Sequence, residues 1–137
     1  MGLTVLDAGV VIGFLDANDT HHQSAHAELR NARDRNDRIV LPASAFAEAS
    51  VGPTRRGAAA VGLVRQFVHR LPIDIEPLSE DIAIAAAALR AHHKSLKLPD
   101  ALVIATAGHL AADHLLTTDR NWPSRAKLKL AATITEL

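Results

Sequence analysis

The chain has 137 residues, of which 48% are hydrophobic, and this length and composition suit one folded globular domain rather than two domains or a disordered chain. It contains no cysteine, which excludes disulfides, thiolate zinc sites and a cysteine nucleophile. Its 15 Lys and Arg balance its 15 Asp and Glu, which argues against binding nucleic acid mainly through a general positive field.

The first half of the chain predicts two buried strands separated by helices. Both strand candidates are short, apolar and partly β-branched runs, at residues 3–6 and 39–41. A T-x-x-Q capping box at Thr20 and Gln23 predicts the start of a helix between them, and a shorter helical turn over residues 10–15 precedes it. The longer helix has one apolar face, formed by Ala25, Leu29 and Ala32.

Two more helices are predicted after the second strand. A brief helix over residues 43–49 should stop near Gly52 and Pro53, and Thr54 should open the next helix. The apolar side of that next helix is formed by Ala60, Leu63, Val64 and Phe67.

The second half continues the alternation of strands and helices. Ser79 is the expected N-cap of an alanine-rich helix that runs to His93, and a further helix covers residues 100–112. Three strand candidates accompany these helices, at residues 73–78, 114–118 and 132–135. The order β-α-β-α-β-α-β-β is typical of a doubly wound α/β sheet, whose ligands bind beyond the carboxyl ends of the strands.

Signals for export or membrane insertion are missing from the sequence. The longest mostly apolar run without a charge, residues 101–112, falls well short of the roughly 18 residues that indicate a membrane span. Residues 1–7 carry no basic region ahead of their apolar stretch. We therefore expect a cytoplasmic protein that makes no membrane contact.

Four acidic residues are embedded among apolar or small neighbours, unlike most surface carboxylates: Asp7, Glu48, Asp100 and Asp119. Each has a structural explanation of its own, as a helix cap, a turn residue or the partner of an arginine. A doubly wound sheet, however, would bring them to one edge, where clustered carboxylates must take up protons or bind cations. Oxygen ligands alone favour Mg²⁺ or Mn²⁺, and such ions serve phosphodiester hydrolysis.

Four segments around these acids carry a family resemblance: residues 5–7 (Val-Leu-Asp), Leu41-Pro42 followed by Glu48, residues 98–102 (Leu-Pro-Asp-Ala-Leu) and residues 116–122 (Leu-Thr-Thr-Asp-Arg-Asn-Trp). Together they make the chain similar to the PIN-domain ribonucleases, in particular to the VapC-type toxins of bacterial toxin–antitoxin pairs. The resemblance covers essentially the whole chain. It implies a three-layer α/β/α sandwich with a parallel sheet of four to five strands, as one domain over residues 1–137.

The resemblance also implies a site and an activity. Asp7, Glu48, Asp100 and Asp119 would be the catalytic and metal-binding quartet, with Asp7 and Asp100 the direct ligands. The implied protein is a Mg²⁺-dependent endoribonuclease toxin that cleaves structured cellular RNA such as tRNA or rRNA. It would form a homodimer and be inhibited by a small VapB-type antitoxin. Two alternatives remain: a PIN-like module that binds RNA or protein without chemistry, and a metal-dependent phosphatase or DNA nuclease.

Four residues are candidate RNA contacts. Arg55 and Arg56 fall at the expected start of a helix, where the helix dipole disfavours cations and an anionic partner would relieve the penalty; simple solvent exposure is the alternative. Arg120 follows Asp119 and would contact the scissile phosphate or neutralise the acids. Trp122, the only tryptophan, would stack on a base or pack in a fixed turn beside Pro123.

Overall fold

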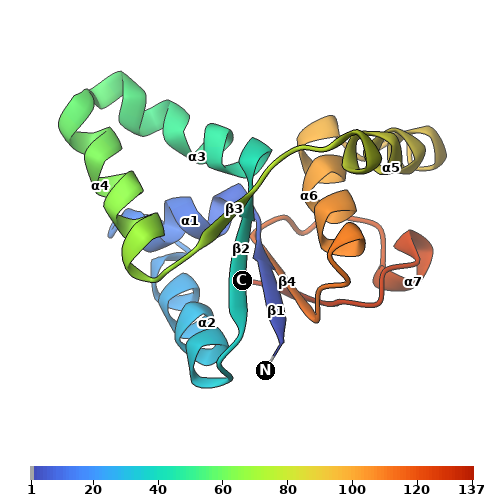
Figure 1. Cartoon of the computed structure of the whole chain (residues 1–137), viewed down its shortest axis with the longest axis horizontal. Coiled ribbons are helices and arrows are strands. Elements are labelled where there is room, and N and C mark those ends of the chain that lie inside the picture. Colours follow the sequence, from blue (N-terminus) through green and yellow to red (C-terminus); the bar gives the residue numbers. More distant parts are fainter. Residues whose placement is uncertain (1) are drawn as a thin grey trace.

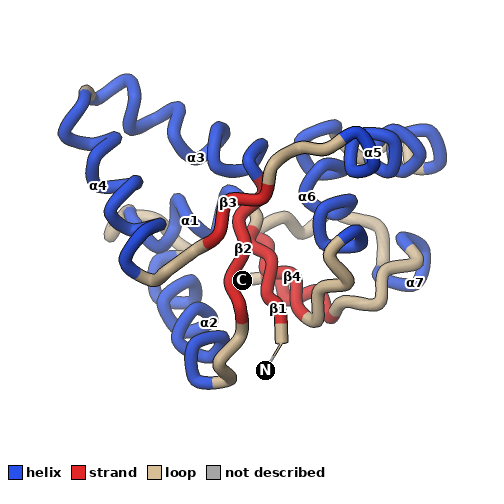
Figure 2. Tube along the Cα trace, viewed as in Figure 1, coloured by secondary structure: helices blue, strands red, loops and turns tan. Residues whose placement is uncertain are grey.

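The computed structural model describes residues 2–137, and its centre is a five-stranded parallel sheet in the order β3-β2-β1-β4-β5 (Figure 2). All four strand pairs are parallel, as the sequence predicts. The strands are β1 Leu3–Leu6, β2 Arg38–Pro42, β3 Asp74–Glu76, β4 His114–Thr117 and β5 Thr133–Glu136.

Seven helices surround this sheet in the described part of the chain. They are α1 Ala8–Leu15, α2 His22–Asp34, α3 Ala43–Arg56, α4 Ala58–Arg70, α5 Glu80–His92, α6 Leu98–His109 and α7 Arg125–Leu128. Figure 1 shows α1, α2 and α4 on one side of the sheet and α5, α6 and α7 on the other, so the expected three-layer α/β/α sandwich is confirmed. None of the helices within residues 2–137 is long and apolar enough to cross a membrane.

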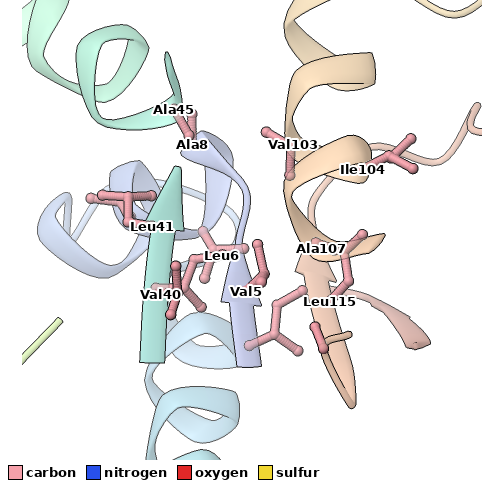
Figure 3. Close-up of a cluster of buried hydrophobic side chains, with 14 of the residues drawn as sticks. Val5, Leu6, Ala8, Val40, Leu41, Ala45, Val103, Ile104, Ala107 and Leu115 are labelled. Carbon is pink, nitrogen blue, oxygen red and sulfur yellow. The ribbon is translucent and has the colours of Figure 1, made fainter. Parts of the chain in front are cut away.

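The core lies between the central strands and the helices that cover them (Figure 3). β1, β2 and β4 are mostly apolar because a parallel sheet is covered on both faces and has no solvated side. Their largest fully buried side chains include Leu6, Leu41 and Leu115, and α6 packs Val103 and Ile104 against them. This packing fixes the relative positions of the strand ends.

The strand order places a topological switch point at the carboxyl ends of β1 and β4. From the central strand β1, the chain builds β2 and β3 on one side and then crosses to build β4 and β5 on the other. Connections that leave two neighbouring strands in opposite directions open a crevice between them, which is where doubly wound sheets bind ligands. Asp7 follows β1, and Asp119 comes two residues after β4.

The predicted capping box at the start of α2 is wrong. The N-cap of α2 is His21, not Thr20, and its side chain makes no capping hydrogen bond. The Asp19 side chain instead accepts a hydrogen bond from the backbone N–H of His21, which organises the turn. The predicted apolar face is confirmed, because Ala25, Leu29 and Ala32 are all buried.

The predicted helix break at Gly52 and Pro53 is also wrong. α3 continues through both residues to Arg56, and Pro53 is buried inside it. The chain breaks instead at Gly57, whose φ of 119° is in the region that favours glycine. The short helix α7 was not predicted; Ser124 caps it by accepting a hydrogen bond from the Lys127 N–H at 3.3 Å.

Candidate functional site

Asp7 occupies the end of the central strand and caps the helix that follows. It is the N-cap of α1, and its Oδ1 accepts a hydrogen bond from the Ala8 N–H at 2.8 Å. The residue is only 7% exposed. Burial raises the pKa of the Asp7 carboxyl above its ordinary value, and the charges of Glu48 and Asp119 raise it further, although two hydrogen bonds oppose the change.

Thr117, which the sequence analysis did not single out, joins two of the predicted acids. Its hydroxyl donates a hydrogen bond to Asp7 Oδ2 at 2.7 Å and accepts one from the Asp119 N–H at 3.0 Å. Asp119 Oδ1 in turn accepts a hydrogen bond from the Asn121 N–H at 2.7 Å. Thr117 is fully buried at the end of β4, so it fixes the switch point from inside. The only sequence signal for it is a threonine that ends an apolar run.

Asp100 enters the site from the first turn of α6 and is half-buried. Burial raises the pKa of its carboxyl, and the charges of Asp7 and Asp119 raise it further. The side chain of Trp122 and the charge of Lys97 act in the opposite direction and lower that pKa. Asp7, Asp100 and Asp119 therefore lie close enough for their charges to repel one another.

Glu48 lies on α3 and is more exposed than the other three acids. It interacts electrostatically with Asp7, and it lines a depression of about 140 Å³ together with Ile12, Asp16 and Arg56. The same depression is thus lined by a predicted acid, Glu48, and by one of the predicted RNA contacts, Arg56. The charges of Glu48 and Asp119 therefore act on Asp7, and those of Asp7 and Asp119 act on Asp100, although the four acids belong to different elements.

The donor chemistry of these four acids fits a hard divalent cation. All four predicted ligands are carboxylates. Burial, and after it the charges of neighbouring acids, raise the pKa values of Asp7 and Asp100, and a bound cation would favour the ionised forms instead. Within residues 2–137, no three Asp, Glu or His side chains lie close enough together to enclose an ion. The acids therefore form a candidate site rather than a preformed cage.

The predicted RNA contacts fall in different surroundings. Arg55 and Arg56 are in the last turn of α3, not at a helix start, so the helix dipole favours their charges and the predicted penalty does not exist. Arg120 is exposed beside Asp119. The Trp122 ring is half-buried and packs against the hydrophobic core, as expected if Trp122 packs beside Pro123 rather than stacking on a base.

A family model described as the PIN domain matches residues 4–128 of the chain. The chain belongs to the PIN-domain family. A search of curated proteins found no match for this PIN domain.

Solved structures with the same fold include several toxin–antitoxin proteins. This PIN domain is 24% identical to a chain of a toxin–antitoxin complex from Klebsiella pneumoniae, with a TM-score of 0.71 over 86% of this chain and 88% of that one. It is 15% identical to a chain of VapBC2 from Rickettsia felis bound to a promoter DNA fragment, with a TM-score of 0.75 over 98% of both chains. The sarcin-ricin loop cleaving toxin VapC20 from Mycobacterium tuberculosis is also 15% identical, with a TM-score of 0.70 over 86% of this chain and 91% of that one. These similarities show a shared fold.

Proposed function

We propose that this PIN domain, as one domain over residues 1–137, is a metal-dependent endoribonuclease and the toxin of a toxin–antitoxin pair. The main support for this proposal is the buried carboxylate of Asp7 at the switch point, which interacts with the charges of Asp100, Asp119 and Glu48. Such a cluster is unfavourable unless it binds cations, and divalent cations at carboxylates serve phosphodiester hydrolysis. The proposed substrate is a structured cellular RNA, such as tRNA or rRNA, in the cytoplasm.

The four acidic residues have two kinds of role in the proposed reaction. Asp7 and Asp100 would hold Mg²⁺ or Mn²⁺, with Glu48 and Asp119 completing the acidic surroundings. A bound ion supplies an activated water and stabilises the leaving oxygen. The Ala8 N–H donates a hydrogen bond to one Asp7 oxygen and the Thr117 hydroxyl donates one to the other, which fixes the orientation of the carboxylate. Thr117 also fixes the backbone of Asp119, so one hydroxyl orients two acids.

An antitoxin is the proposed protein partner, supported by the fold shared with chains of toxin–antitoxin complexes. The depression beside Glu48 is bordered by Ile12 and Leu15, which are 40% and 39% exposed. Apolar side chains beside a carboxylate suit a partner segment that carries both apolar and basic residues. A basic side chain placed there would block the acids from metal and RNA.

The proposed homodimer is supported by an apolar helix face that nothing covers within residues 2–137. α5 exposes Ile84 to 67% together with the alanines at 83, 85, 87, 88 and 91. Its start carries Glu80 and Asp81, while a groove of about 620 Å³ at its other end includes Lys127 and Lys129 and no acidic residue. Two antiparallel copies of α5 would place each acidic start against a basic groove, as a two-fold axis allows.

Two alternative functions retain parts of this site. A binding module would use the same fold without chemistry, and a metal-dependent phosphatase or DNA nuclease would use the same acids on another substrate. A panel of RNA, DNA and phosphomonoester substrates separates these functions, because only the proposed enzyme cleaves RNA selectively.

The proposed function is tested by mapping cleavage sites across total cellular RNA after brief expression of the protein. We expect new RNA ends at one or a few positions in a structured RNA, and their absence with Asp7→Asn. The same ends in the wild type and the variant, or none in the wild type, would contradict the proposal.

A further inference from the structure

Trp122 has a hydrogen-bond donor without an acceptor. Its indole Nε1 is buried and is the single buried side-chain polar atom within residues 2–137 that has no hydrogen-bond partner. Native proteins rarely leave a buried donor unpaired, because the group loses its hydration and receives nothing in return. We therefore expect this N–H to find an acceptor in some state of the protein.

The acceptor that the structure offers is a group of the protein itself. The Trp122 ring packs against the hydrophobic core, and Nε1 is hidden from solvent, so neither a base nor a phosphate of RNA reaches it directly. The loop that carries Trp122 is fixed by the Asn121 N–H, which donates to Asp119 Oδ1 at 2.7 Å. Trp122 therefore has a defined position relative to the acids.

The group beside the indole is the carboxylate of Asp100. Trp122 favours the ionised form of Asp100, as an N–H directed towards a carboxylate does, although no complete hydrogen bond forms in this conformation. A carboxylate has two oxygens, so one can bind an ion while the other accepts a hydrogen bond. Carboxylate ligands of metals are commonly held in this way by a neighbouring donor.

We propose that Trp122 is a positioning residue whose indole N–H donates a hydrogen bond to the Asp100 carboxylate when that carboxylate binds a divalent cation. This inference rests on the proposed function, since it takes Asp100 as a metal ligand. It assigns the only tryptophan of the chain a role in the metal site rather than in base stacking. Residues that orient a metal ligand typically contribute roughly 10–100-fold to metal affinity.

The first test is Mn²⁺ binding to the purified protein by calorimetry, comparing the wild type with Trp122→Phe. Phenylalanine keeps an aromatic ring in the core and removes the N–H donor. We expect the dissociation constant to rise roughly 10–100-fold. The matched control is Phe67→Leu, a packing change in α4, which should lower the melting temperature and leave Mn²⁺ affinity unchanged. An affinity for Trp122→Phe within about twofold of the wild type would overturn the inference.

A second test uses the unaltered protein, so it does not depend on a variant that folds. A chain with one tryptophan gives one indole N–H resonance in a ¹⁵N-labelled sample. We expect this resonance to move downfield when Mg²⁺ saturates the site, because the N–H gains an acceptor. An unmoved resonance at saturation would overturn the inference while leaving the nuclease intact. A wild-type protein that binds no divalent cation would instead contradict the proposed function.

Discussion

Asp7 combines the greatest burial and the clearest electrostatic conflict of the four predicted acids. Its carboxyl is buried at the switch point, and the nearby acids add to the effect of burial in raising its pKa. An acidic group whose pKa is higher in the folded state than in the unfolded state lowers the stability of the fold at pH values above both pKa values. The residue that suits metal binding is therefore unfavourable for the metal-free fold.

Replacing Asp7 by Asn should stabilise the metal-free protein at pH values well above the raised pKa of Asp7. The variant keeps the side-chain volume and removes the buried charge, so its melting temperature should exceed that of the wild type. The difference in melting temperature should shrink as the pH falls through the raised folded-state pKa of Asp7. It should disappear below the ordinary value of 3.8, where the carboxyl is neutral in both the folded and the unfolded state. Thermal unfolding in EDTA across this range measures it. A wild type more stable than the variant in mildly alkaline buffer would contradict the claim that the Asp7 charge destabilises the metal-free fold.

Asp37, which directly precedes β2, stabilises the fold in its ionised form, whereas ionised Asp7 destabilises it. Burial raises the pKa of its carboxyl, but hydrogen bonds from Thr4, Arg35 and Gly2 and the charge of Arg35 outweigh burial and lower it. Its stabilising effect is present above 3.8 and is lost as the pH falls through the lowered folded-state value. Because Asp37 is unchanged in both proteins, its effect cancels in the comparison of the wild type with Asp7→Asn.

The sequence located the four acids but not the groups that hold them. Asp7 and Asp119 were recognisable because polar residues that follow apolar strands stand out. The hydrogen bond between Thr117 and Asp7 joins residues 110 positions apart, and nothing local in the sequence indicates it. The buried N–H of Trp122 is equally invisible, because burial of a single atom depends on tertiary packing.

The start of α1 depends on a close contact with the loop after β4. A Cβ atom at Gly9 would overlap Thr118 Oγ1, so no larger side chain fits while Thr118 keeps its position. By contrast, a Cβ atom at Gly62 within α4 would meet open space. These two helical glycines are a matched pair for testing the packing beside the site.

We expect Gly9→Ala to lower stability by about 1–3 kcal/mol, as overpacking does, and to lower RNA cleavage because Thr118 precedes Asp119. Gly62→Ala should raise stability by about 0.5–1 kcal/mol and leave cleavage unchanged, because alanine favours a helix. Urea unfolding and an RNA cleavage assay measure both effects. Equal stability of the two variants would refute the contact between α1 and Thr118.

Strands were predicted more accurately than helix boundaries. Apolar runs bounded by polar residues identified β1, β2 and β4 almost to the residue, because their burial on both faces leaves a clear pattern. The boundary at Gly52 and Pro53 was misplaced, because tertiary packing of α3 overrides the local cost of a proline in a helix. That error also reversed the dipole argument for Arg55 and Arg56.

Arg55, Arg56 and Arg120 remain predicted phosphate contacts. Replacing any one of them by Gln should weaken RNA binding and lower the slope of log affinity against log salt by about 0.7–1. Arg120→Gln should also slow the chemical step, because Arg120 follows Asp119, while the α3 variants should affect affinity alone. Salt-titrated binding in Ca²⁺, with Arg30→Gln on α2 as the control, measures the slopes. Unchanged slopes for all three would place them on the solvated surface.

The proposed homodimer depends on the exposed face of α5. Light scattering should give twice the 14.6 kDa chain mass, with dissociation on dilution. Ile84→Glu should produce a monomer, because it puts a charge on the apolar face. Leu63→Glu changes a similarly exposed residue, 64% compared with 67%, on α4 and should leave the dimer intact. A monomeric wild type at every concentration, or a dimeric Ile84→Glu variant, would contradict this interface.

In the proposed function, the acids at the switch point support metal-dependent cleavage of RNA. The most direct measurement is the rate at which purified protein cleaves a mixture of structured cellular RNAs in Mg²⁺, comparing the wild type with Asp100→Asn and with Asp34→Asn, an exposed acid on α2. We expect cleavage by the wild type and Asp34→Asn that EDTA abolishes, and a rate for Asp100→Asn lower by orders of magnitude with the fold retained. Cleavage by Asp100→Asn at the wild-type rate would contradict the assignment of the site.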